Sequence, residues 1–160
     1  MKVLAMAVAV SAAFAGSVQA QGCVDSTDRN ITILENGRSF EVPMMLRYTA
    51  RIGDRDLHNS AGVRLTSTAA ILQQDRANFH KSGRSDVSGP FRDGPDGYFN
   101  TLQRRTQISR ARIYNECWMS ARQVHDFEVN LRNAAIPGVV DVVVFRHPNG
   151  GLGLALSQAD

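Results

Sequence analysis

Long hydrophobic runs are scarce in this chain of 160 residues, and the one marked run lies at its start. After Lys2, apolar residues extend from Val3 to about Ala15, and small residues follow as far as Ala20. Such a run is too short for a stable membrane span and has the layout of a secretory signal peptide. We therefore predict a signal peptide over residues 1–20, with cleavage after Ala15 as the alternative to cleavage after Ala20.

The same segment admits two other interpretations, a core helix and a lipoprotein leader. Cys23 would carry the lipid, but the residues before it, 20–22, lack the large aliphatic residue that such sites usually carry. No later segment is long and apolar enough to cross a membrane. The sequence therefore favours an exported protein, periplasmic or secreted, with a single domain over residues 21–160.

Cysteine is nearly missing, since only Cys23 and Cys117 occur. An even number of cysteines in an exported chain favours a disulfide bond. This bond would close a loop of about 95 residues, to which chain-entropy reasoning assigns about 4–5 kcal/mol. Two unpaired buried thiols are the alternative.

Lysine is equally rare, because sixteen of the eighteen cationic residues are arginine. Arginine suits bidentate contacts with carboxylates and phosphates, although a GC-rich genome produces the same bias. The formal net charge of +3 falls to +2 when Lys2 is removed. So small an excess over about 140 residues gives no strong nucleic-acid signal.

Short β-rich runs dominate the start of the mature chain. Residues 31–42, ITILENGRSFEV, predict a hairpin, because Asn36-Gly37 supplies the positive φ angles of a type I′ turn. Pro43 is expected to end the second strand or to place it at a sheet edge. A third strand is predicted over residues 44–52.

Helical and loop patterns follow. Periodicity predicts a helix over residues 67–80, and the density of Gly, Pro, Ser and Asp predicts an exposed loop over about 81–97. A short helix is expected within residues 98–109, and a strand that carries the second cysteine within 110–119. The apolar residues expected to be buried by the two helices are Leu65, Ala69, Leu72, Phe79, Phe99, Leu102 and Ile108.

Residues 120–134 leave helix and strand open. A Ser120…Gln123 capping box favours a helix, whereas residues 126–132 alternate as a strand does. Two strands follow, over residues 139–145 and 152–157. Strands first, helices in the middle and a final hairpin predict the α+β class, an antiparallel sheet with two or three helices packed on one face.

The stretch RIGDRDLHNSAG holds the candidate catalytic groups. In an extended backbone Asp54, Asp56 and His58 share one face, and two carboxylates with an imidazole can bind a cation or perform acid–base chemistry. Asp75 and His80 join them only if the next helix folds back. The spacing matches no metal signature, so we assign no metal and no cofactor. Turn chemistry at a strand–helix corner is the alternative.

Arginine and aromatic residues interleave in the stretch QRRTQISRARIYNECW. This pattern suits phosphates, lipid head groups or anionic glycans, and an ordinary solvated helix face predicts the same exposure. Trp118 is also expected to pack against the disulfide. The candidate anion-binding patch comprises Arg104, Arg105, Arg110, Arg112 and Trp118.

Other polar residues are interpreted as solvent-facing. Asp93 and Asp96 lack the spacing of calcium ligands, so we expect them in a solvated loop. His125 and His147 have no partner that the sequence identifies, and both are expected at the surface.

Three functions fit these features. A non-catalytic exported module that binds an envelope protein or an anionic envelope polymer needs only a disulfide-linked scaffold and a basic surface, and we favour it. A small metal-assisted hydrolase would require the side chains of Asp54, Asp56, His58 and His80 to converge. A structural part of an envelope assembly would dock through an edge strand such as residues 151–157.

Overall fold

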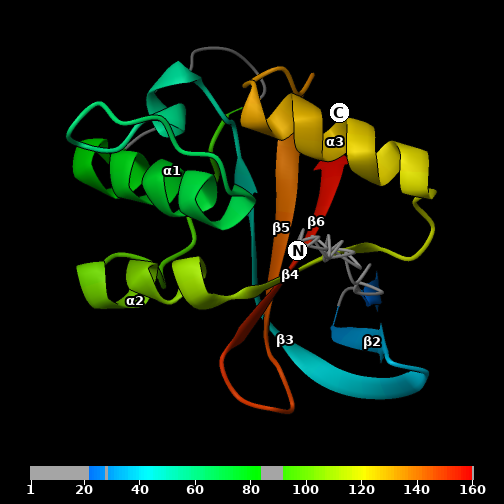
Figure 1. Ribbon diagram of the computed structural model, residues 1–160. Helices are drawn as coiled ribbons and strands as arrows, with labels where there is room; N and C mark the ends of the chain where they lie inside the picture. The colour runs from blue at the N-terminus through cyan, green and yellow to red at the C-terminus, as the bar shows by residue number, and fades with distance from the viewer. Residues whose placement is uncertain (1–21, 28, 84–91, 160) are drawn as a thin grey trace, which may run out of the picture.

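The computed structural model describes residues 22–27, 29–83 and 92–159. Six strands pair in the order β1-β2-β3-β5-β6-β4 and close into a barrel, with helices outside it (Figure 1). The strands are β1 Cys23–Ser26, β2 Asn30–Glu35, β3 Arg38–Ala50, β4 Arg112–Glu116, β5 Val139–Arg146 and β6 Leu152–Ala159. The helices are α1 Thr68–Ser82, α2 Leu102–Thr106 and α3 Ala121–Arg132, with 3-10 turns η1 Asp54–Leu57 and η2 Ile108–Arg110.

The closed barrel corrects the predicted fold class. We expected an open α+β sheet covered by helices on one face, and that prediction is wrong because β4 pairs in parallel with both β1 and β6. A parallel pair joins segments that are distant in the sequence, so no local turn announces it. The expected edge strand at residues 151–157 is also wrong, since β6 lies between β5 and β4.

The hairpin predicted at Asn36-Gly37 is confirmed. Glu35 pairs with Arg38 across a two-residue turn, and Asn36 and Gly37 have φ angles of 53° and 71°. Both values are the positive angles that a type I′ turn requires. Pro43 does not end the second strand, because β3 continues through it.

β3 changes its partner in the middle. Its first half pairs with β2 as far as Pro43, and its second half pairs with β5 from Met44 onward. A β-bulge between Met44 and Leu46 shifts the register by one residue, which turns the following side chains to the opposite face. The residues that face the barrel interior are Phe40, Val42 and Met44, and those that face the helices are Leu46, Tyr48 and Ala50.

Apolar residues fill both the barrel and the space between barrel and helices. β5 contributes to each layer, with Val143 and Phe145 inside the barrel and Val142 and Val144 toward the helices. Burial on both faces explains why residues 142–145 of this strand are all apolar. The interior is tight: a Cβ atom on Gly153 would lie 2.3 Å from the Phe145 ring.

The helix predictions are largely confirmed. α1 begins at the Ser67 cap, and α3 resolves the ambiguity of residues 120–134 in favour of a helix with the expected Ser120…Gln123 capping box. The expected burial of Leu102 is wrong, since 70% of its surface is exposed. Leu102 is the first residue of a five-residue helix, and the core contact of this region comes instead from Phe99.

Two predictions concern segments that are only partly described. The predicted signal peptide, residues 1–20, lies outside the described residues, and so do residues 84–91 of the expected exposed loop. Of that loop, Lys81 and Ser82 belong to α1, and the carboxyl groups of Asp93 and Asp96 are buried. Across the described ranges, no helix combines the length and hydropathy needed to span a membrane.

The predicted disulfide is confirmed and lies at the seam where the barrel closes. β1 and β4 pair through only Cys23↔Asn115 and Val24↔Glu116. The Cys23–Cys117 bond, with a Cα–Cα distance of 4.9 Å, covalently joins the two strands there. The Cys117 N–H also donates to the Val24 carbonyl at 2.8 Å. So short a ladder makes this seam the weakest contact around the barrel.

We expect the double variant Cys23→Ala/Cys117→Ala to lose about 2–5 kcal/mol of unfolding free energy and to open first at the β1–β4 seam. Amide hydrogen exchange followed by mass spectrometry measures the opening. Residues of the β5–β6 hairpin serve as the internal control, because eight residue pairs hold them. Equal loss of protection in both places would contradict the weak-seam interpretation.

Candidate functional site

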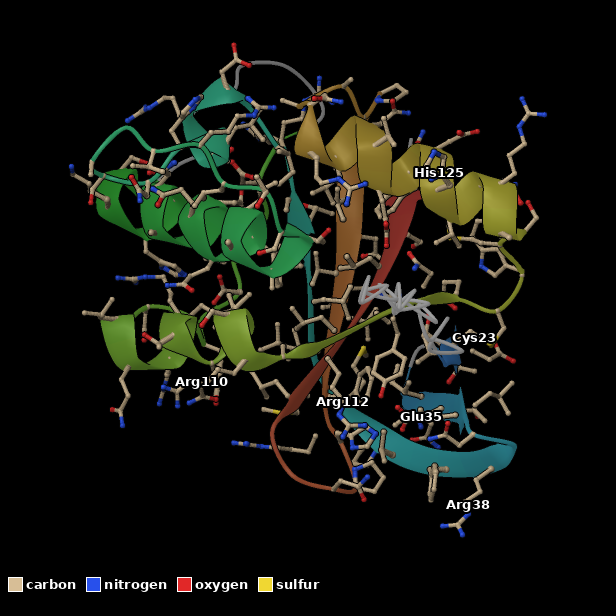
Figure 2. The ribbon with its side chains drawn as sticks, in the orientation of Figure 1. Cys23, Glu35, Arg38, Arg110, Arg112 and His125 are labelled. Carbon is tan, nitrogen blue, oxygen red and sulfur yellow. A yellow bond between two sulfur atoms is a disulfide. The ribbon has the colours of Figure 1, made fainter. Side chains whose placement is uncertain are left out.

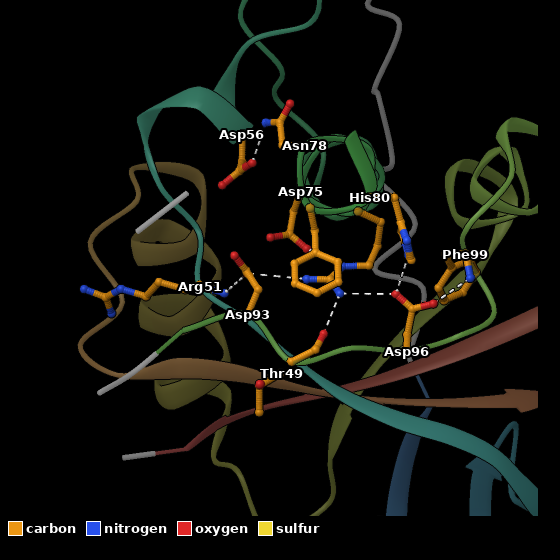
Figure 3. A network of polar contacts seen from close by, with 12 residues as sticks. Thr49, Arg51, Asp56, Asp75, Asn78, His80, Asp93, Asp96 and Phe99 are labelled. Atoms are coloured by element: carbon orange, nitrogen blue, oxygen red, sulfur yellow. Dashed lines mark hydrogen bonds and ion pairs between the residues drawn. The ribbon is translucent and has the colours of Figure 1, made fainter. Parts of the chain in front are cut away.

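A buried arginine is the centre of the polar interior. Arg76 of α1 is fully buried, and its guanidinium contacts three carboxyl groups (Figure 3). Its Nε donates to Asp75 Oδ2 at 2.7 Å, Nη1 donates to Asp96 Oδ2 at 3.2 Å, and Nη2 lies 3.4 Å from Asp93 Oδ1. Nη1 also donates to the Gly94 carbonyl at 2.8 Å. These bonds attach α1 to the segment that holds residues 93–96.

Two aromatic rings enclose the same guanidinium. Arg76 Cζ lies 4.4 Å from the centre of the Tyr48 ring on β3 and 4.7 Å from that of Phe79 on α1. A desolvated guanidinium over an aromatic face gains cation–π energy in addition to its ion pairs. Arg76 therefore connects the helix to the barrel wall.

The pKa values of two carboxyl groups around Arg76 are shifted in opposite directions. Burial, assisted by neighbouring carboxyl groups, raises the pKa of Asp75 well above its usual range despite the guanidinium beside it. Burial also acts to raise the pKa of Asp96, but hydrogen bonds from the Phe99 N–H, His80 and Arg76 outweigh it and lower that pKa. The Asp96 carboxylate thus balances the buried positive charge.

Asp93 extends the network to the end of β3. Its Oδ1 accepts the Arg51 backbone N–H at 2.7 Å (Figure 3). The Arg51 side chain donates to the carbonyls of Ile136, at 2.8 Å, and Gly138. The segment before α2, the end of β3 and the loop before β5 are therefore held together by charged hydrogen bonds.

The five candidate catalytic residues fall into two groups. Asp75 and His80 belong to the Arg76 cluster, where His80 Nε2 lies 2.9 Å from Asp96 Oδ2. Asp54, Asp56 and His58 stay at η1, where His58 Nδ1 contacts the Asp54 carbonyl at 3.1 Å. Within the residues that the structure describes, no group of three or more His, Cys, Asp or Glu side chains is placed to hold a metal ion.

The arginine and aromatic residues of the candidate patch lie on different parts of the surface. Arg110 follows α2, whereas Arg112 lies beside Glu35 at the β2–β3 hairpin, with 3.0 Å between Arg112 Nη1 and Glu35 Oε1 (Figure 2). Arg104 stacks on the Tyr98 ring. Trp118 is 65% exposed beside α3, so the expectation that it packs against the disulfide is wrong.

The expectation that His147 lies at the surface is also wrong. It is 97% buried, and its Nε2 lies 3.2 Å from Glu35 Oε2 while its Nδ1 accepts the Asn149 N–H at 3.1 Å. These bonds tie the β5–β6 turn to the β2–β3 hairpin. The partners lie 112 residues apart in the sequence, so no local pattern announces them. His125, by contrast, is exposed on α3 as expected (Figure 2).

A groove of about 760 Å³ lies between η1, α1 and α2. Its volume is within the range of small-molecule binding sites, roughly 300–1,000 Å³. No carboxylate belongs to the described residues that line it. The polar residues of the lining are the cations Arg55, Lys81 and Arg105, the amides Asn59, Gln73, Gln74 and Asn78, and the side chains of His58 and Ser60.

This groove is the surface best suited to bind a ligand. The lysine and arginine residues of the lining attract an anion, and side-chain amides supply both donors and acceptors. Of the candidate patch it includes Arg105, and of the candidate catalytic set it includes His58. The sequence did not reveal this site because its lining comes from three separate segments. One signal was available: the spacing of Gln74, Asn78 and Lys81 indicates that they share one face of a helix.

We expect Arg76→Ala to lower the free energy of unfolding by about 3–5 kcal/mol, because it leaves buried carboxyl groups without their counter-charge. Urea denaturation measures the loss. Arg122→Ala is the matched control, since 91% of that side chain is exposed and its removal should change stability by less than about 0.5 kcal/mol. Equal effects of the two substitutions would exclude a structural role for the cluster.

Asp96 predicts a specific acid sensitivity. Because its pKa is lower in the folded state than in the unfolded chain, its contribution is fully present above about pH 4 and is lost as the pH falls through the lower folded value. The difference in unfolding free energy between the wild type and Asp96→Asn should therefore shrink below pH 4. Asp54→Asn, at an exposed carboxyl, controls for the loss of one charge. A difference that stays constant down to pH 2 would contradict this assignment.

The comparisons with known proteins add no function to this geometry. No family model, no curated protein and no solved structure matches the chain. The chemistry of the site is therefore assigned from the residues themselves: a buried ionic cluster that holds the segment 93–99 on α1, and a cationic, amide-lined groove on the opposite side of the same helix.

Proposed function

We propose that the chain is a non-catalytic binding module of the cell envelope whose partner is an anionic envelope polymer. The observation that carries this proposal is the groove between η1, α1 and α2, whose lining includes Lys81 and Arg105 and, among its described residues, no acidic side chain. Such a surface attracts an anion mainly through charge, and dissolved salt screens that attraction. Binding is therefore expected to weaken as the salt concentration rises.

The engagement of the candidate catalytic groups supports a role without catalysis. The Asp56 carboxyl accepts hydrogen bonds from the Gly53 N–H and the Asn78 amide, Asp75 accepts from Arg76 Nε, and His80 Nε2 lies 2.9 Å from Asp96 Oδ2. Groups used in this way hold structure and are not free to take up a substrate proton. No specific observation favours the hydrolase alternative.

Export is part of the same proposal and rests on two features. Disulfide bonds persist in oxidising compartments, and the Cys23–Cys117 bond joins the barrel at its closing seam. The N-terminal residues 1–20 have the composition of a signal peptide. Together they support the proposal that the binding surface lies where envelope polymers occur.

We expect the double variant Lys81→Ala/Arg105→Ala to elute from a heparin column at lower salt than the wild type, because two of the three groove cations are removed. The matched control is Arg38→Ala/Arg122→Ala, which removes the same charge from exposed positions on the hairpin and on α3. Circular dichroism confirms that both variants are folded.

Equal elution of the two double variants would show that net charge, and not the groove, governs retention. Absence of wild-type retention at low salt would exclude an anionic polymer as the partner. Either result rejects the proposal in its present form.

A further inference from the structure

A chain of hydrogen bonds runs from the interior to the groove. The Asp56 side chain is buried at the floor of η1, and its Oδ1 accepts from Asn78 Nδ2 at 2.8 Å. Asn78 Oδ1 in turn accepts from Gln74 Nε2 at 3.0 Å. Gln74 and Asn78 both line the groove, so a buried acid is connected to its surface through two amides.

The Asp56 carboxylate determines how the side-chain amides of Asn78 and Gln74 are oriented. A carboxylate can only accept hydrogen bonds, and the second Asp56 oxygen accepts the Gly53 N–H at 2.9 Å. Asn78 must therefore turn its Nδ2 toward Asp56 and its Oδ1 toward Gln74. Gln74 must then donate a hydrogen bond from its Nε2 to that oxygen. The Oε1 of Gln74 remains as an acceptor that faces the ligand space.

Asn59 is oriented from the other side of the groove. Its Oδ1 accepts the backbone N–H groups of Ala61 and Val63, at 3.0 and 2.9 Å, so its Nδ2 donors remain for a ligand. The groove thus offers a fixed acceptor and a fixed donor, both from neutral amides. A hydroxyl group both donates and accepts from the same oxygen atom, so a single ligand hydroxyl can satisfy both.

Two of the three groove cations, Lys81 and Arg105, come from other positions in the lining than these amides. Lys81 follows Gln74 by seven residues on α1, which corresponds to a rise of about 10 Å along the helix. Arg105 approaches from α2. A ligand that contacts both ends must therefore carry its hydroxyl groups and its anionic group on one extended framework.

We infer that the groove recognises an acidic saccharide, with a hydroxyl group on the Gln74 and Asn59 amides and a carboxylate or phosphate group on Lys81 and Arg105. This inference rests on the proposed function. It narrows the class of partner from any anionic polymer to an anionic polymer that carries hydroxyl groups. Leu65 and Leu102 at the groove wall supply apolar contact for the C–H face of a sugar ring. Asp56 acts as a positioning residue, since it fixes the amides without reaching the ligand.

The test compares two probes of equal charge by isothermal titration calorimetry. Trigalacturonic acid carries three carboxylates and many hydroxyl groups, whereas a triglutamate peptide with both termini blocked carries three carboxylates and no hydroxyl group. We expect the wild type to bind the saccharide about tenfold more tightly, because the peptide has no hydroxyl to pair with the fixed amides. Neutral maltotriose, which lacks the charge, should bind more weakly than trigalacturonic acid.

Two variants separate recognition of hydroxyl groups from attraction of charge. Gln74→Ala and Asp56→Asn should each reduce the preference for trigalacturonic acid over triglutamate about five- to tenfold, while retention on heparin stays near that of the wild type. Gln103→Ala is the matched control, because this exposed glutamine of α2 lies outside the groove lining. Thermal unfolding confirms that Asp56→Asn is folded, and Gln74→Ala gives the same test without touching a buried group.

The outcomes distinguish this inference from the proposed function. Heparin retention together with equal affinity for the two probes, unchanged by Gln74→Ala, would overturn the saccharide assignment and leave the anion-binding module in place. Tighter binding of the triglutamate peptide would point instead to an acidic polypeptide and would also overturn it. Absence of heparin retention and of binding to either probe would overturn both proposals.

Discussion

The burial of one guanidinium constrains this molecule more than any other interaction. Arg76 is removed from water on a helix that packs against an apolar barrel wall, so its charge and its donors must all be matched from within the protein. Asp75, Asp93 and Asp96 provide that match, and two of them come from a segment with no regular structure. The requirement to satisfy a buried cation is therefore what gives residues 93–96 a defined position.

The barrel supplies the wall against which this cluster forms. Closure depends on a two-pair parallel seam that the disulfide reinforces, and the interior is narrow enough that a glycine must face the Phe145 ring. The bulge after Met44 then turns the second half of β3 outward, which brings Tyr48 under α1. A local shift of one residue in the register thus couples the barrel to the polar layer.

The polar residues of α1 form two sets, one that is buried in the protein and one that lines the groove. Asp75 and Arg76 occupy the buried stripe of α1, while Gln74, Asn78 and Lys81 line the groove. The two sets meet through Asp56, whose carboxyl is buried but whose bonded amides reach the surface. This arrangement keeps Asp56, Asp75 and Arg76 buried while cations and amides line the groove.

Features encoded within a few residues could be predicted from the sequence: the Asn36-Gly37 hairpin and the caps of α1 and α3. The Cys23–Cys117 bond could also be predicted although it spans 94 residues, because two cysteines allow only one pairing. Barrel closure, the burial of Arg76 and the His147–Glu35 contact could not, because each joins segments distant in the chain and none leaves a periodic or turn signature. The candidate site shows the same division. The sequence shows that η1 and α1 carry many polar residues. Only the packing of η1, α1 and α2 determines which of these side chains are buried as ion pairs and which line a common groove. Local backbone preferences act over a few residues, whereas desolvation and charge balance are set by neighbours that the fold brings together.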